Sequence, residues 1–302
     1  MDTMRDVRMR LKSILNTKQI TESMRLISTR KVQKVRVRMA DNRPYLQQSV
    51  RIIQNLHKEE RFRKHGYFAG RGGGKPLVIL ITGDRGLCGG YNTNAAKEAY
   101  ALAASLGEAE AIAIGAKGRD YFRRRQVPVG GLFRGLSENP FHEDARRIAG
   151  IALDKYNGGE AGEVYLVYTE YHTMLAQEAK AVRLLPVDMG AAGKWAGPPA
   201  VAEGGEGPAA ESDAAALMDW ASEDEAFVQY AVSAYVAAAL FGAMLESAVC
   251  EQCARVMSMD SAVKNAEKMI ETLTLRFNEM RQGAITQEIA EVVGGANVVG
   301  QK

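Results

Sequence analysis

The chain has 302 residues, of which 46% are hydrophobic and 25% are charged, an ordinary composition for a protein with a packed core. Its longest apolar stretch, residues 231–243, contains Ser233, Tyr235 and Gly242 and is shorter than the roughly 20 residues that a membrane span needs. The first residues lack the uninterrupted apolar core of a secretory signal. We therefore expect a cytoplasmic protein with no membrane span of its own.

The net charge of +3 conceals an uneven distribution of charge along the chain. Residues 1–64 hold 17 Lys and Arg against 6 Asp and Glu, which leaves 22 basic and 30 acidic residues for the remainder. Such a basic arm is typical of segments that meet nucleic acid, an anionic membrane face or an acidic protein surface. The charge alone does not choose among these partners.

Cysteines and histidines are the residues that could form a disulfide framework or a metal site. Cys250 and Cys253 lie three positions apart within a helical pattern, and Cys88 is distant from both. No further Cys or His stands near that pair to complete a zinc set, so buried or facing thiols are favoured over a redox or metal pair. The histidines are scattered, without a nucleophile beside them, and we expect no catalytic, metal or cofactor site. They are His57, His65, His142 and His172.

Residues 4–58 carry a helical pattern of apolar side chains. Within each of four groups the spacing is mostly three and four residues, while the groups are out of phase with one another. Only Pro44 interrupts the pattern, where it could end or kink the helix. A continuous helix of about 55 residues would be roughly 80 Å long. The groups are Met4, Val7, Leu11 and Ile14; Ile20, Met24 and Ile27; Val32, Val35 and Met39; and Leu46, Val50 and Ile53.

From residue 70 the sequence changes to the pattern of a small α/β unit. A glycine-rich linker at 71–76 leads into a short apolar run at 76–82, which predicts a buried strand. Further strands are expected at 109–115, 163–171 and 179–187, and helices at 95–106 and 143–156. Alternating strands and helices favour a mostly parallel, Rossmann-like sheet that is covered on both faces.

A second long helix is predicted at the C-terminal end. Residues 190–210 are rich in Gly, Ala and Pro without an apolar period, which predicts a loop or flexible linker. Beyond them an apolar seam continues over four heptads, with Gln252 at one seam position. Few helix breakers occur between residues 213 and 287, so one helix of about 75 residues, roughly 110 Å long, is expected. The seam comprises Val249, Val256, Met259, Val263, Ala266, Ile270, Leu273, Phe277 and Met280.

Two helices of this length are too long for a globular core, and they flank one compact unit. The economical arrangement is a long antiparallel two-helix coiled coil of the N- and C-terminal helices, with an inserted small α/β domain. We divide the chain into an N-terminal coiled-coil helix (residues 1–64), an α/β domain (70–188), a flexible linker (189–211) and a C-terminal coiled-coil helix (212–302).

The most enzyme-like feature is the glycine-rich segment GDRGLCGGYN at residues 83–92. It follows a predicted strand and precedes a helix, a place where phosphates are often bound. The segment has neither the Gly-Lys-Ser/Thr of a P-loop nor the spacing GxGxxG, so a tight structural turn is favoured over a nucleotide site. Asp84 and Arg85 would then pair with each other or with neighbouring groups.

The C-terminal residues carry the most specific pattern in the chain. After the apolar seam and the polar pair Arg281 and Gln282, the sequence has a β-branched residue and Thr, then two acids, then Gly-Ala. These residues are Ile285, Thr286, Glu288, Glu291, Gly295 and Ala296. The run resembles the C-terminal motif of ATP synthase γ subunits. Residues 12–24, 83–92 and 245–266 resemble the same family in order and spacing, while Glu279 stands where the family commonly has a basic residue.

The resemblance implies the central rotor shaft of a bacterial F-type ATP synthase. It implies a noncatalytic subunit whose helices lie along the axis of a hexamer of α and β subunits, and whose α/β domain meets the ε subunit and the c ring. Such a subunit is peripheral, at the cytoplasmic face of the inner membrane. It couples translocation of protons or sodium ions to ATP synthesis or hydrolysis at the β subunits.

The motif match also implies which residues contact the partners. These are Arg281 and Gln282 against a loop of a β subunit, Thr286 and Glu288 at the seat of the shaft tip, and Met24 and Arg255 near the β subunits lower down.

Two other functions remain open on the residues alone. A small α/β enzyme that uses the loop at 83–90 would bind nucleotide as an isolated chain. A coiled-coil tether or nucleic-acid binder that uses the basic arm would show steeply salt-dependent affinity for DNA. The arm has almost no interleaved aromatic residues, which disfavours a single-stranded nucleic-acid partner. Neither function accounts for the C-terminal pattern.

Overall fold

The computed structural model describes residues 3–190, 193 and 224–299, and the chain forms two compact units. The first unit combines Met1–Thr29 with Arg255–Lys302, and the second is Arg30–Ala254. The long helices α1 (Met4–Lys58) and α8 (Asp224–Val299) contribute to both units. Most of the predicted linker at 190–210, and the predicted start of the last helix at 213, lie outside the described residues.

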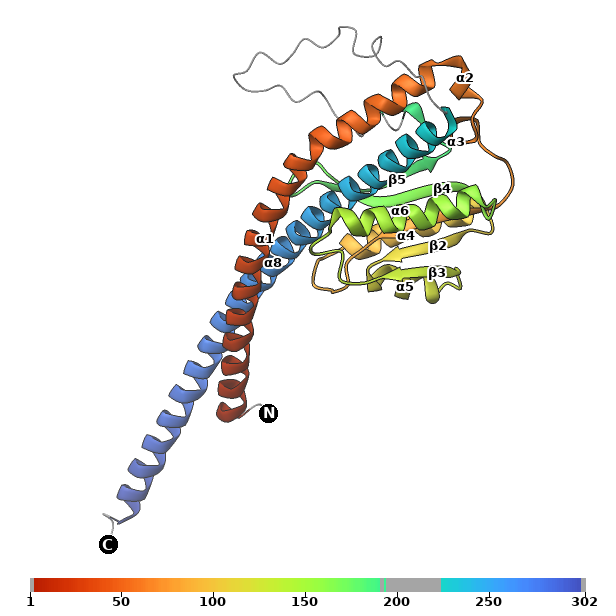
Figure 1. The fold of residues 1–302 in the computed structure, drawn as a ribbon. Helices are drawn as coiled ribbons and strands as arrows, with labels where there is room; N and C mark the ends of the chain where they lie inside the picture. Colours follow the sequence, from red (N-terminus) through yellow and green to blue (C-terminus); the bar gives the residue numbers. More distant parts are fainter. Residues whose placement is uncertain (1–2, 191–192, 194–223, 300–302) are drawn as a thin grey trace, which may run out of the picture. The chain divides into compact units, whose positions relative to one another are not determined.

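A five-stranded sheet forms the centre of the second unit (Figure 1). The strand order is β3 (Val129–Phe133), β2 (Glu110–Ile114), β1 (Lys75–Ile81), β4 (Ala161–Tyr171) and β5 (Gln177–Leu185). Neighbouring strands are parallel except for β5, which runs antiparallel to β4. The prediction of a mostly parallel sheet is confirmed. The four predicted strands correspond to β1, β2, β4 and β5, with ends that differ by at most two residues.

Helices connect and cover these strands. The predicted helices at 95–106 and 143–156 correspond to α4 (Tyr91–Leu106) and α6 (His142–Asn157). Sequence analysis did not identify the short helices α2 (Glu60–Arg63) and α3 (Gly66–Ala69), nor α5 (Ala116–Arg123) and β3. The sequence of β3, VGGLF, contains two glycines that weaken a strand pattern, and α5 is too short to show a helical period.

Side chains of β1 alternate between two apolar cores. Leu77, Ile79 and Ile81 face the core formed with α6 and with the second unit's parts of α1 and α8. Val78 and Leu80 face the core formed with α4 and α5. Because both faces of the sheet are covered, β1 is apolar throughout instead of alternating between apolar and polar residues.

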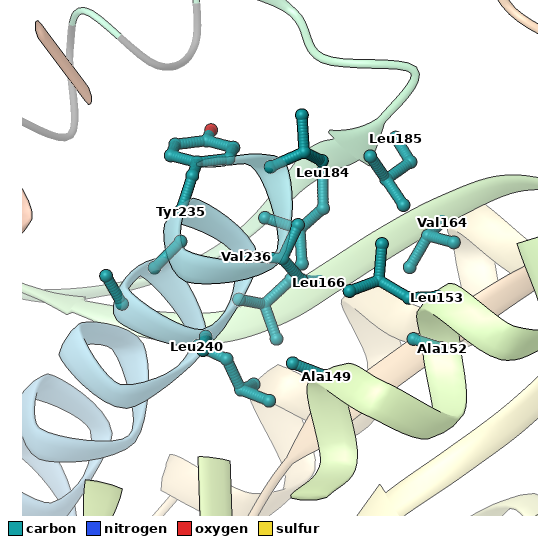
Figure 2. Close-up of a cluster of buried hydrophobic side chains, with 14 of the residues drawn as sticks. Ala149, Ala152, Leu153, Val164, Leu166, Leu184, Leu185, Tyr235, Val236 and Leu240 are labelled. Atoms are coloured by element: carbon teal, nitrogen blue, oxygen red, sulfur yellow. The ribbon is translucent and has the colours of Figure 1, made fainter. Parts of the chain in front are cut away.

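Helix α8 is a core element of the second unit. Figure 2 shows its Tyr235, Val236 and Leu240 beside Leu166 of β4 and Ala149 of α6. Among the described residues, α8 is the one helix with a window long and apolar enough to cross a membrane, and 72% of that window is buried within the protein. Packing against the sheet therefore accounts for its hydropathy.

The first unit is an antiparallel pair of helices. Lys18 Nζ of α1 lies 2.8 Å from Glu267 of α8, and Arg25 lies 3.8 Å from Asp260, so residue numbers rise in one helix as they fall in the other. The predicted seam of α8 is buried at Met259 and becomes half-buried from residue 270. In Figure 1 the last turns of α8 continue beyond the start of α1.

The structure resolves two features of α1 that the sequence pattern left open. The apolar group of Ile20, Met24 and Ile27 is 59%, 40% and 56% exposed. At this level Ser28 is buried instead, because the stripe drifts around the helix and this group faces away from α8. Pro44 neither ends nor divides α1, since the helix continues to residue 58.

The turn after β2 supplies a test of backbone geometry in the second unit. Gly115 has φ of +96°, and a Cβ placed on it would lie 2.1 Å from the carbonyl oxygen of Thr82. Gly107 has φ of +87° and no atom within 4 Å of such a Cβ. We expect Gly107→Ala to cost about 1–2 kcal/mol of unfolding free energy through backbone strain alone. Gly115→Ala should cost on the order of 3–5 kcal/mol, because the Thr82 carbonyl must also move.

Denaturant titration followed by near-UV circular dichroism measures both losses. Gly107→Ala is the matched control for the left-handed backbone. Equal losses in the two variants would contradict the close contact with Thr82.

Candidate functional site

The crevice where a doubly wound sheet usually binds its ligand is occupied by α8. Such a site lies at the carboxyl ends of the strands where the strand order reverses, here between β1 and β4. The Thr169 amide at the end of β4 donates to Ser247 Oγ at 3.2 Å, and the Cys250 thiol donates to the Thr169 carbonyl at 3.5 Å. A Cβ on Gly83 would lie 2.9 Å from the Glu251 carboxyl group. Three residues of α8 therefore fill this position.

The glycine-rich loop after β1 is held by side chains of its own region. Asn92 Oδ1 accepts from the Gly83 amide at 2.7 Å. The Asp84 carboxylate accepts from the Ala116 amide at 2.9 Å and from the Gly135 amide at 2.7 Å. Asp84 thus joins the loops that follow β1, β2 and β3, an arrangement that agrees with the predicted structural turn.

Burial governs the titration of the groups around this crevice. It raises the pKa of Tyr91 well above its ordinary value, and the nearby Glu251 carboxylate adds to the effect. It also raises the pKa of the Cys250 and Cys253 thiols, which lowers their reactivity as thiolates. Cys88 is likewise buried and reduced, so all three cysteines are buried free thiols.

Glu246 is a half-buried carboxyl group whose pKa is clearly shifted. Its Oε1 accepts from the Tyr171 amide at 2.8 Å. Burial raises its pKa to about 7 and Glu170 contributes in the same direction, while the hydrogen bond and the cations of His172 and Lys180 oppose the shift. Below about pH 7 the folded state therefore favours the protonated carboxyl group.

The β4–β5 hairpin brings together one group of potential metal ligands. Glu170, His172 and Glu178 have ligand atoms within 4.8 Å of one another. Sequence analysis missed this group because it depends on the cross-strand register, in which Glu170 lies opposite Glu178. Lys180 Nζ already contacts both oxygens of Glu170, at 3.0 and 2.9 Å, so a metal ion would have to displace an ion pair.

The predicted contact residues lie on the surface of the first unit, with one exception. Arg281, Gln282, Thr286 and Glu288 are all exposed on the last described turns of α8. The Thr286 hydroxyl donates to the Gln282 carbonyl at 2.9 Å, a local bond that leaves the outward face of the helix available. This stretch therefore exposes a guanidinium, an amide and a carboxylate to solvent.

Met24 and Arg255 differ from each other in accessibility. Met24 is exposed on α1, whereas Arg255 is only 9% exposed on α8. A buried guanidinium contributes to a partner surface less directly than an exposed one.

An apolar stripe accompanies the polar groups at the end of α8. Ile285, Ile289 and Val292 are 48%, 58% and 66% exposed, and their spacing of four and three residues places them on one face of the helix. Sequence analysis named Ile285 only as part of a motif. The spacing was the signal that could have identified the stripe.

Comparison with known proteins assigns this architecture to a family. The family model described as ATP synthase matches residues 3–299. The ATP synthase γ chain of Alkaliphilus metalliredigens is 36% identical over 296 residues and covers 98% of each chain. The chain belongs to the ATP synthase γ chain family. The sodium-ion-specific ATP synthase γ chain of Acetobacterium woodii is 34% identical over 302 residues, with 99% of each chain covered.

Solved structures share the fold. A chain in the cryo-EM structure of the Euglena gracilis mitochondrial ATP synthase (OSCP, F1 and c-ring) has a TM-score of 0.66 and 18% identity, covering 99% of this chain and 96% of that one. A chain in the Tetrahymena thermophila central stalk and c-ring structure has a TM-score of 0.56 and 20% identity, covering 80% and 99%. The predicted family and fold, a helix pair with an inserted α/β domain, are confirmed.

Because α8 occupies the usual ligand position, we expect that the isolated chain does not bind nucleotide. The loop at 83–92 has no phosphate-binding lysine, and Ser247, Cys250 and Glu251 take the ligand position. Isothermal calorimetry with ATP should show no saturable heat. A micromolar site that disappears in the variant Gly89→Val with Gly90→Val would contradict the structural role of this loop.

The raised pKa of Glu246 predicts that the free energy of unfolding depends on pH. Its pKa is about 7 when folded and near 4.5 when unfolded, so the folded state binds more protons between these values and stability falls as pH rises through this window. Glu246→Gln keeps an oxygen acceptor for the Tyr171 amide and removes the half-buried charge. At pH 8 it should raise the unfolding free energy by on the order of 1–3 kcal/mol.

At pH 4, where the wild-type carboxyl group is protonated, the variant and wild type should be nearly equal in urea titrations. Glu143→Gln, at an exposed position of α6, is the control. A pH-independent effect of Glu246→Gln would exclude the titration as its cause.

Proposed function

We propose that this chain is the central rotor shaft of a bacterial F-type ATP synthase. The observation that carries the proposal is the family match over residues 3–299, combined with an antiparallel helix pair whose last described turns expose both the C-terminal motif and an apolar stripe. The shaft couples translocation of protons or sodium ions through a c ring to ATP synthesis or hydrolysis at β subunits. The proposal names both ions because one of the relatives is named as sodium ion specific.

The shaft acts through binding free energy and itself makes or breaks no bond. Each orientation of an asymmetric helix pair favours one nucleotide-binding conformation in a given β subunit, and rotation exchanges these preferences among the three β subunits. The filled switch-point crevice supports a noncatalytic role, because the usual ligand position of the sheet is taken by Ser247, Cys250 and Glu251.

The proposed partners are the α and β subunits of the hexamer, the ε subunit and the c ring. The structures that share this fold come from complexes named with F1, a c-ring or a central stalk. The basic N-terminal helix suits acidic surfaces of a hexamer, and nucleic acid is not a proposed partner. The complex is membrane-associated, and we place this chain peripherally at the cytoplasmic face of the inner membrane.

The functional division of the chain is part of the same proposal. Residues 1–64 and 212–302 supply the shaft helices, residues 70–188 supply the α/β domain, and residues 189–211 link it to the last helix. Within the shaft, Arg281 and Gln282 contact a β subunit, and Thr286 and Glu288 help to seat the tip. Met24 and Arg255 lie near the β subunits lower down the shaft.

Removing the polar pair at the tip tests the β contact. A guanidinium in a partly desolvated site forms a charged hydrogen bond to a carboxylate worth about 1.5–3 kcal/mol. Arg281→Ala with Gln282→Ala should therefore lower the ATPase activity of the assembled complex severalfold or more. Helix content should be nearly unchanged, because alanine is a good helix former.

The matched control is Lys264→Ala with Lys268→Ala, on exposed positions of the same helix. Lys264 pairs with Asp260 at 2.8 Å in an exposed i, i+4 pair, a type of ion pair that contributes little to stability. Activity is measured per complex after the subunit content has been verified. Wild-type activity in the Arg281 and Gln282 variant would refute the contact, although not the family membership.

A further inference from the structure

Strand β3 is an edge of the sheet with an open hydrogen-bonding side. In the described part of the chain it pairs with β2 alone. The Phe133 carbonyl accepts from the Gly115 amide at 2.8 Å and so faces β2. Because backbone groups alternate in direction along a strand, the amide and carbonyl of Leu132 face away from β2. They are available to another strand.

The glycine pair leaves two successive positions of β3 without side chains. A Cβ on Gly130 would lie 1.8 Å from Glu110 Oε1, so packing explains the first glycine. A Cβ on Gly131 would make only ordinary contacts, the nearest 3.5 Å from Ile112, and its φ is not in the left-handed region. Neither packing nor conformation therefore demands glycine at 131. Glycine in a strand is characteristic of sites where another backbone approaches closely.

Two hollows meet along this edge. One of about 370 Å³ runs beside β3 and is lined by Arg119, Arg123 and residues 127 and 129–132. Another of about 740 Å³ lies at the start of the strand and shares Val127, Val129 and Gly130 with the first. An extended segment paired with Leu132 would therefore find room for side chains beside the strand.

The charge around the edge is strongly positive. Among the described residues, Arg123, Arg124 and Arg134 are exposed and form no salt bridge with a carboxylate, and the Arg124 Nε donates only to the Asp120 backbone carbonyl, at 3.1 Å. Arg125 lies over the ring of Tyr121 at 3.7 Å. The acids nearby are already matched by cations: Asp120 by Arg119 at 2.6 Å, Glu110 by Lys155 at 2.9 Å and Glu108 by Lys75 at 2.7 Å.

We propose that the β3 edge is a docking site for an extended, acidic segment of a partner protein, which adds to the sheet as a sixth strand. Main-chain hydrogen bonds to Leu132 supply affinity, and the unmatched arginines select acidic side chains. Arginines on a short edge also discourage self-association, since two copies of this edge repel each other. This site belongs to the α/β unit, so it does not depend on the proposed contacts at the end of α8.

The test uses the full chain and a fluorescein-labelled eight-residue peptide of alternating Glu and Val. Fluorescence anisotropy should show saturable binding that weakens at least tenfold in Arg123→Glu with Arg124→Glu. The control reversal is Lys58→Glu with Lys97→Glu, two exposed positions on other helices, which should leave the affinity unchanged within twofold. A peptide of alternating Lys and Val should not bind. Equal binding of the Lys and Val peptide would overturn the proposal.

The strand pairing has its own readout. Leu132→Pro removes the outward amide while leaving the Phe133 carbonyl for Gly115, and it should weaken peptide binding at least tenfold. Amide exchange in the wild-type chain covers the case in which that variant fails to fold. Saturating Glu and Val peptide should slow exchange at Leu132 at least tenfold. Unchanged exchange at Leu132 under saturation would refute strand addition.

Discussion

The continuity of α8 is the constraint on which the rest of the structure depends. A single hydrogen-bonded helix runs from Asp224 to Val299. Its first part is buried on nearly all sides in the second unit, its middle has a narrow seam in the first unit, and its last turns are exposed. One helix therefore passes through three environments in succession: a protein core, a narrow helix–helix seam and water. Its composition changes accordingly, from Val and Ala in the core to a heptad seam and then to polar groups with an apolar stripe.

The same helix fills the position at which a sheet of this topology usually binds its ligand. The polar edges of β1 and β4 at the switch point need hydrogen-bonding partners, since buried amides without them cost about 1–3 kcal/mol each. Ser247 and Glu246 supply acceptors to the amides of Thr169 and Tyr171, at 3.2 and 2.8 Å. In other sheets of this type a phosphate or cofactor meets the corresponding ends. Here the polar groups that would recognise a ligand attach a helix to the sheet.

The limits of prediction from the sequence follow from the range of the interactions involved. Strands such as β1 were predictable because burial on both faces produces a continuous apolar run. The exposure of Ile20, Met24 and Ile27 was not predictable, because local spacing shows that residues share a face of the helix without showing which face packs against the other helix. Two other features were not predictable because they depend on contacts between residues distant in sequence. The strand register places Glu170 opposite Glu178. The packing of α8 places Glu251 against Gly83. The motif at residues 281–288 was found through resemblance, and its exposure is consistent with a partner surface.

The apolar stripe at the end of α8 is not covered by any other part of the described chain. Ile285, Ile289 and Val292 are 48%, 58% and 66% exposed to water. By contrast Met259, on the same helix, is packed against its surroundings and is only 4% exposed. Leaving a large aliphatic side chain in water forgoes about 1.5–3 kcal/mol relative to full burial. Three such residues on one face represent a substantial driving force for association, while Arg281 and Gln282 beside them supply the directional bonds that apolar contact lacks. A partner that encloses the end of α8 would gain affinity from the stripe and orientation from the polar pair, so both sets of side chains would contribute to one contact.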